Sequence, residues 1–175
     1  MWYAKTYSPV QVGSIDGTDT VPHDHAVERA LTAHYTAPKH LTTDPRKTLF
    51  VARLNLSTTE ESLQKLFGRF GELDQVILIR NQVIVVTGTS QGYGFVTFRR
   101  SAAASEAYKR AHHAVLDEHV ILVDYERSRI MKGWVPRRLG GGFGGQKESG
   151  QLRFGARERG FREPIYCAVD KAAML

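Results

Sequence analysis

The sequence predicts an α+β domain over roughly residues 48–126, in which strands and helices follow one another in the order β-α-β-β-α-β. Three observations predict it. Apolar residues recur with a period of two in four short segments and at helical spacing in two longer ones. Hydroxyl and glycine residues stand where the helices should begin and end. Residues 1–46 and 128–175 lack such periods over most of their length, so we expect irregular arms around a domain at 47–127.

The first half of the domain begins with a strand at Thr48–Leu54. Thr59 then precedes Glu60 and Glu61, and a hydroxyl cap followed by carboxylates in the positively polarised first turn indicates a helix start. We expect this helix to end at Gly71. Its apolar face consists of Leu63, Leu66, Phe67 and Phe70.

The second half repeats the pattern. Strands are predicted at Leu73–Ile79, Gly92–Phe98 and Val120–Tyr125, and a helix at Ser101–Arg110. This order of elements is the split βαβ, or ferredoxin-like, arrangement. It gives a four-stranded antiparallel sheet with two helices on one face, so side chains on the other face are left open for binding.

Two segments outside these elements also carry signals. Residues 23–36 place apolar residues near helical spacing after Asp24, a possible cap, so a short helix is expected in the N-terminal arm. Residues 82–86 are apolar for a loop. They would either extend the neighbouring strands as a hairpin about Thr87-Gly88 or form an insertion without function.

The third strand carries the functional signal. Residues 91–98 read Gln-Gly-Tyr-Gly-Phe-Val-Thr-Phe and fit every position but the first of the RNA-binding octamer K/R-G-F/Y-G/A-F-V-x-F/Y. Because side chains alternate along a strand, Tyr93 and Phe95 share the open face, and Phe50 of the adjacent first strand joins them. Nucleic-acid bases stack on exposed aromatic rings at about 1–3 kcal/mol each. We therefore predict base stacking on Phe50, Tyr93 and Phe95.

The alternative is that these rings belong to an ordinary core. Gly92 and Gly94 flank Tyr93, and two glycines are unfavourable in a strand that only needs packing, so the core alternative is disfavoured. The motif departs from its pattern in two places. Gln91 replaces a basic residue, so a phosphate or base contact there is expected to be weaker or to come from another residue. Arg53, which stands where Asn is common in the first-strand hexamer, is a candidate local substitute.

The octamer and hexamer identify the domain as a member of the RNA-recognition-motif (RRM) family. The flanks, Gly13–Asp19 with Pro22–Asp24 and then Lys132–Gly142, resemble one branch of it, which includes a protein of the U-eleven/U-twelve (minor spliceosome) small nuclear ribonucleoprotein (snRNP) and a related protein of the U-one particle. The resemblance covers about residues 13–164. It implies a nuclear protein that binds an snRNA stem-loop and helps recognise the 5′ splice site of minor-class introns. Other snRNP proteins, bound through the N-terminal arm, are the implied protein partners. Members continue into an Arg-rich tail, so the ending at Leu175 is expected of a truncated or alternative product.

Positive charge is concentrated after the domain. Residues 1–126 carry 13 Lys/Arg against 14 Asp/Glu, whereas residues 127–163 carry 10 against 3. Residues 140–145 contain five glycines, which disfavours a regular helix, so we expect a largely flexible basic strap along RNA, or else a solvated disordered tail. The polar and phosphate contacts predicted for RNA are Arg53, Gln91, Tyr125, Arg127, Arg129, Lys132, Arg137 and Arg138, with Arg153, Arg157, Arg159 and Arg162 as further candidates.

Other functions are disfavoured. His112, His113 and His119 lack cysteine partners, so no metal is expected, and no cofactor fingerprint or small-molecule site is recognisable. A single cysteine, Cys167, and the absence of a long apolar run favour an intracellular protein without a membrane segment. Two alternatives to RNA binding remain. One is an RRM that docks a peptide of a partner protein, and the other is a small enzyme on the same fold.

Overall fold

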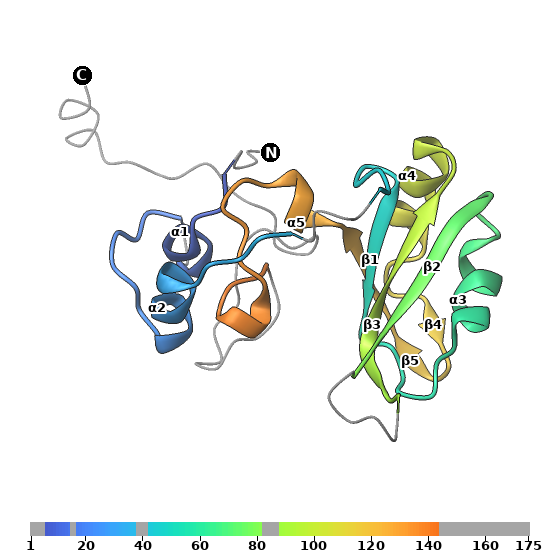
Figure 1. Cartoon of the computed structure of the whole chain (residues 1–175), viewed down its shortest axis with the longest axis horizontal. Helices are drawn as coiled ribbons and strands as arrows, with labels where there is room; N and C mark the ends of the chain where they lie inside the picture. The colour runs from blue at the N-terminus through green and yellow to red at the C-terminus, as the bar shows by residue number, and fades with distance from the viewer. Residues whose placement is uncertain (1–5, 15–16, 38–41, 82–87, 144–175) are drawn as a thin grey trace. The chain divides into compact units, whose positions relative to one another are not determined.

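The structure is a computed structural model that describes residues 6–14, 17–37, 42–81 and 88–143 (Figure 1). It divides into two compact units. The RRM unit spans Lys39–Ile130, and the flanking unit combines Met1–Pro38 with Met131–Leu175. No helix within the described ranges is long and apolar enough to cross a membrane.

The RRM unit has the predicted β-α-β-β-α-β order. Its main elements are β1 (Thr48–Ala52), α3 (Glu60–Phe67), β2 (Leu73–Arg80), β3 (Ser90–Phe98), α4 (Ser101–Arg110) and β6 (Leu122–Tyr125). The four strands form an antiparallel sheet in the order β2-β3-β1-β6. The predicted α+β, ferredoxin-like fold is therefore confirmed. A two-stranded hairpin, β4 (Val115–Leu116) and β5 (His119–Val120), precedes β6, and a short helix, α5 (Arg127–Ile130), follows it.

The core of this unit lies between the sheet and the two helices, which cover one face of the sheet (Figure 1). Phe67 of α3 and Phe98 of β3 are the largest fully buried side chains, at 0% and 1% exposure. Removing either ring would leave a cavity and cost about 3–5 kcal/mol. The buried strand residues of this face are Leu49, Val51, Leu78, Val96, Phe98 and Val123, and those of the helices are Leu63, Phe67, Ala104 and Ala107.

Helix α3 begins as its sequence predicts. The Oγ1 of Thr59 accepts a hydrogen bond from the backbone N–H of Ser62 at 3.3 Å. The pKa of Glu60 lies below its ordinary value, chiefly because the carboxylate accepts a backbone hydrogen bond at its own position, and the Arg80 guanidinium, 2.9 Å away, adds to this. The helix ends at Phe67 with Gly68 as its C-cap rather than at Gly71. The N–H of Gly68 donates to the carbonyl of Gln64 at 2.8 Å, so the last helical turn closes before Gly71 is reached.

The fourth sheet strand starts two residues later than expected, at Leu122. The reason is that His119–Val120 pairs with Val115–Leu116 in the separate hairpin. The predicted extension of β2 and β3 through residues 82–86 lies outside the described residues.

The flanking unit contains α1 (Pro9–Gly13), α2 (His25–Thr32) and a 3-10 turn, η1 (Arg137–Leu139). Helix α2 falls within the segment expected to be helical, and Asp24 caps it by accepting from the N–H of Val27 at 2.7 Å. The hydrophobic core of the flanking unit combines residues from before the RRM unit with residues from after it. The buried residues are Tyr7, Val12, Ala30 and Val135, and Trp134, Leu139 and Phe143 are among those packed against them.

Residues 131–143 are ordered in the structure, unlike the flexible strap we expected. Tyr7 donates its N–H to the carbonyl of Lys132 at 2.8 Å and its hydroxyl to the carbonyl of Gly142 at 2.9 Å. A Cβ on Gly140 would lie 2.0 Å from the carbonyl oxygen of Ala26. Glycine therefore serves here for close backbone approach rather than for flexibility. The basic residues predicted beyond position 143 lie outside the described residues, as does Cys167.

Candidate nucleic-acid interface

Three aromatic rings gather on the sheet face that the helices leave open. We call Phe50, Tyr93 and Phe95 the aromatic platform. The ring centroid of Phe50 is 5.8 Å from that of Tyr93 and 5.7 Å from that of Phe95, and the latter two are 6.4 Å apart. All three side chains are partly exposed. The sequence prediction that they form one cluster agrees with this geometry.

Strand alternation places the rings there. Phe50 pairs with Phe95 across the β1–β3 ladder, and direct partners share a face. The preceding pair, Leu49 and Val96, is fully buried against the helices. The platform rings are therefore outside the core, contrary to the alternative in which they pack within it.

The two glycines of β3 have backbone roles. A Cβ on Gly94 would lie 2.5 Å from the carbonyl oxygen of Ile77, so only glycine lets β2 approach this closely. Gly92 has a φ of +73°, in the left-handed region, and its carbonyl accepts from the N–H of Leu54 at 2.9 Å. Both positions fix the path of β3 on either side of the Tyr93 ring.

Further side chains on the open face were not predicted from the sequence. Ile77 of β2 pairs with Phe95, and Asp124 of β6 pairs with Phe50. Leu122 is the partner of Ala52. Once the alternation of β6 is assigned from its buried residues, the same period-two rule would have identified Asp124.

The prediction for Tyr125 was wrong. We predicted it as an RNA contact, but it pairs with the core-facing Leu49 and therefore points toward the helices. Its ring stacks on Tyr108 of α4 at a centroid distance of 4.4 Å, and its hydroxyl lies 3.3 Å from the Oγ of Ser105. The physical reason is strand alternation, which puts Asp124 on the open face and the next residue behind the sheet.

Arg127 is held at the edge of the open face. Its Nη2 and Nε donate to the two carboxylate oxygens of Asp124 at 2.9 and 3.3 Å. Because Asp124 is the cross-strand partner of Phe50, this bidentate pair orients the guanidinium beside the platform. The contact of Arg127 with RNA remains a prediction.

The prediction for Arg129, that it contacts an RNA phosphate, was also wrong. Its Nε and Nη2 donate to the Glu126 carboxylate at 2.8 and 2.6 Å, and its Nη1 and Nη2 also bind the carbonyl and hydroxyl of Thr43. The side chains of Arg129 and Glu126 are only 13% and 5% exposed. The single turn of α5 brings the guanidinium back to a carboxylate three residues earlier. Arg129 therefore holds the end of the domain together instead of offering its charge to a phosphate.

The other predicted contacts of the RRM unit lie at the Tyr93 end of the platform. Ala52, the cross-strand partner of Tyr93, precedes Arg53, which is exposed and has a φ of +60°. Gln91 begins the octamer and is exposed. Their contacts with RNA remain predictions.

The remaining predicted contacts belong to the flanking unit. Lys132, Arg137 and Arg138 are all exposed. Arg137 donates to the carbonyl of Phe143 at 2.8 Å, and the guanidinium carbon of Arg138 lies 5.9 Å from the ring centroid of Tyr35. These contacts position two adjacent cations on an ordered turn.

The chain is similar to known proteins over most of its length. The family model described as RNA recognition motif matches residues 49–122. The U11/U12 small nuclear ribonucleoprotein 35 kDa protein of Bos taurus is 54% identical over 168 residues, which covers 96% of this chain and 67% of that protein. The Danio rerio protein of the same name is 49% identical over 170 residues, covering 97% of this chain and 80% of that one. The U1 small nuclear ribonucleoprotein 70 kDa homolog of Schizosaccharomyces pombe is 42% identical over 125 residues, or 70% of this chain and 47% of that protein.

Solved structures give a weaker match. The Sex-lethal RNA recognition domains 1 and 2 of Drosophila melanogaster are 27% identical, with a TM-score of 0.43 and coverage of 46% of this chain and 50% of that one.

Proposed function

The chain belongs to the family of U11/U12 small nuclear ribonucleoprotein 35 kDa proteins, and on that premise we propose that it binds snRNA through the aromatic platform as a component of the minor spliceosome. The family is not enzymatic. The proposed site of action is the nucleus. The proposed partners are an snRNA stem-loop, the pre-mRNA near the 5′ splice site, and other snRNP proteins that bind the N-terminal part of the chain.

The aromatic platform is the observation that supports RNA binding best. An RRM recognises single-stranded loops by splaying out bases and stacking two or three of them on its sheet aromatics. The three rings of the platform lie within 6.4 Å of one another, which suits successive bases. At about 1–3 kcal/mol for each stacked base, the platform would supply a large part of the affinity.

Charged and polar side chains would supply the remaining contacts to RNA. Arg53, Gln91 and Arg127 lie around the platform, where they would contact the bases or the backbone of the bound loop. Lys132 and the Arg137–Arg138 pair are exposed on the flanking unit, where they would neutralise phosphates of the stem. Each phosphate neutralised contributes about 0.7–0.9 to the salt dependence of log K. We therefore expect a plot of log K against log salt concentration to have a slope that reflects several phosphate contacts.

The test is replacement of the platform rings in the full chain. A labelled transcript of a U11 snRNA stem-loop serves as the probe, and affinity is measured by fluorescence anisotropy. Phe50→Ala should weaken binding by about 5- to 150-fold, the equivalent of one lost stack. Phe50→Tyr is the matched control, because it keeps the ring and should bind nearly as well as the native chain.

The triple replacement of Phe50, Tyr93 and Phe95 by alanine should reduce binding to the nonspecific, salt-sensitive level. Circular dichroism checks that the variant remains folded, which is expected because the rings lie outside the core. RNA affinity that survived in a folded triple variant would contradict the proposal. It would favour the alternative in which this RRM docks a peptide.

A further inference from the structure

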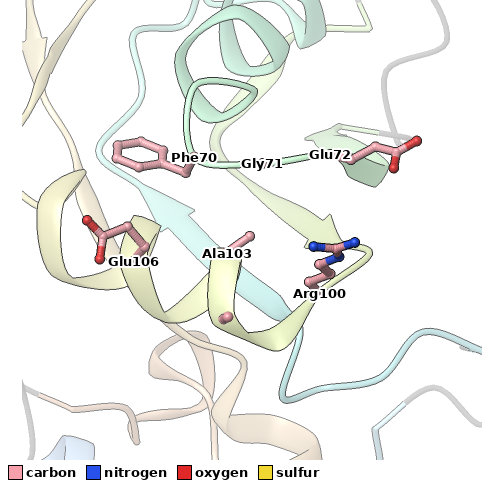
Figure 2. Close-up of a pocket in the computed structure, with 7 residues that line it drawn as sticks. Phe70, Gly71, Glu72, Arg100, Ala103 and Glu106 are labelled. Atoms are coloured by element: carbon pink, nitrogen blue, oxygen red, sulfur yellow. The ribbon is translucent and has the colours of Figure 1, made fainter.

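A groove lies on the helix side of the RRM unit, between the turn that joins α3 to β2 and the first half of α4. We call it the helix-side groove. Its volume is about 450 Å³, within the range of ligand pockets. Figure 2 shows Phe70 and Glu106 toward one end, Glu72 and Arg100 toward the other, and Gly71 facing Ala103 between them. The lining residues are Phe70, Gly71, Glu72, Arg100, Ala102, Ala103 and Glu106.

Small residues form the floor of the groove. A Cβ on Gly71 would lie 2.6 Å from the Cβ of Ala103, so Gly71 packs directly on Ala103 and any larger residue at position 71 would clash there. Ala102 is exposed, and Phe70 is partly exposed at the edge of the core. The floor is therefore apolar and can cover one apolar side chain of a ligand.

The acidic side chains at the rim have basic partners, whereas one basic side chain there has no acidic partner within the described ranges. Glu72 pairs with Arg99 at 2.8 Å and Glu106 pairs with Arg110 at 3.2 Å. The carbonyl of Arg100 accepts from the N–H of Ala104 at 3.3 Å, but its guanidinium makes no hydrogen bond or ion pair with any residue that the structure describes. The first turn of α4 also lacks an acidic residue, and Arg100, at its N-cap, makes no side-chain capping bond. The uncompensated charge at this rim is thus positive, and its complement is a carboxylate.

We propose that the helix-side groove docks a short segment of a partner protein in which an aromatic side chain is adjacent to an acidic residue. The aromatic ring would cover Phe70, Ala102 and Ala103, and the carboxylate would pair with Arg100. The groove and the aromatic platform lie on opposite faces of one sheet-and-helix sandwich. The RRM unit would therefore bind this peptide and RNA at the same time. The inference stands without the proposed RNA function.

The experiment is a selection of random linear peptides by display against the full chain, followed by affinity measurements on the enriched peptides. Arg100→Glu reverses the unmatched charge, and Ala102→Tyr fills the groove from an exposed position. Lys109→Glu is the matched control, because it makes the same charge change on α4 outside the lining residues. Thermal melting checks that all three variants fold.

Enriched peptides should combine an acidic and an aromatic residue, and shift the backbone amide signals of Gly71 and Ala103. Arg100→Glu and Ala102→Tyr should each weaken binding by about tenfold or more, whereas Lys109→Glu should not. Peptides that bind all variants alike, or that shift the amides of the aromatic platform instead, would overturn the proposal. So would self-association of the chain that Ala102→Tyr abolishes, because a second copy would then be the occupant.

Discussion

Replacing Gly140 by alanine should unfold the flanking unit and leave the RRM unit intact. Gly140 has a φ of +89°, where an L-residue is strained by about 1–2 kcal/mol. The new Cβ would lie 2.0 Å from the carbonyl oxygen of Ala26 and 3.2 Å from the backbone nitrogen of Ala30, so the backbone of α2 must move. Such overpacking costs a further ~1–3 kcal/mol. Together these give about 2–5 kcal/mol, enough to unfold a unit whose core is this small.

Amide hydrogen exchange measured by NMR tests this directly, because it reports the two units separately. In the Gly140→Ala chain, protection should fall at Val12 and Ala30 of the flanking unit and stay unchanged at Val51 and Val96 of the RRM unit. Gly88→Ala is the matched control. Gly88 also has a positive φ, +47°, but nothing lies within 4 Å of its added Cβ, so it tests backbone strain without the clash. Unchanged protection at Val12 and Ala30 would show that the close approach of the α2 backbone does not explain why position 140 is glycine.

Other predictions concern the RRM unit. Tyr125→Phe should lower the free energy of unfolding by about 0.5–1.5 kcal/mol in urea titrations and leave RNA affinity unchanged, because the hydroxyl bonds to α4 behind the sheet. Arg129→Ala leaves the buried Glu126 carboxylate unpaired and should cost about 3–5 kcal/mol in the same assay; a loss below 1 kcal/mol would contradict the pairing. The folded-state pKa of Glu60 is lowered, so its contribution to stability is present above its unfolded pKa of about 4.3 and is lost as the pH falls through the folded pKa. Glu60→Gln should therefore destabilise the chain at neutral pH and make no difference at about pH 2, as judged by urea midpoints at the two pH values.

The RRM unit was predictable because its signals are local. The period of two in residues 91–98 fixes which rings share a face. Thr59 marks a helix start, and the N–H that it caps belongs to Ser62, only three residues later in the sequence. Tyr125 was misassigned because the signal that decides its face is not local. It was chosen for its chemistry at the strand end, whereas its face depends on register with Leu49, 76 positions earlier. The position of a strand residue along the chain does not fix its face until the pairing is known.

The flanking unit could not be predicted in the same way. Its bonds join Tyr7 to Lys132 and Gly142, and one of these spans 135 positions in the sequence. Neither half has a period long enough to indicate a core of its own. Arg129 was misread for a related reason, because its partner Thr43 comes from the segment before the domain.

Glycine content alone therefore does not decide whether a segment is flexible. Residues 131–143 are rich in glycine and arginine, a composition typical of disordered RNA-binding tails. They also contain Trp134, Val135, Leu139 and Phe143, apolar side chains that join the core formed with Tyr7. With those anchors buried, the glycines provide the left-handed turn and the close backbone contacts that the packing requires, and the arginines between them point outward from an ordered turn. A basic residue held in this way loses less conformational entropy when it meets a phosphate than the same residue on a flexible tail. The sequence pattern to examine in Gly/Arg-rich flanks is thus the number of large apolar residues among the glycines.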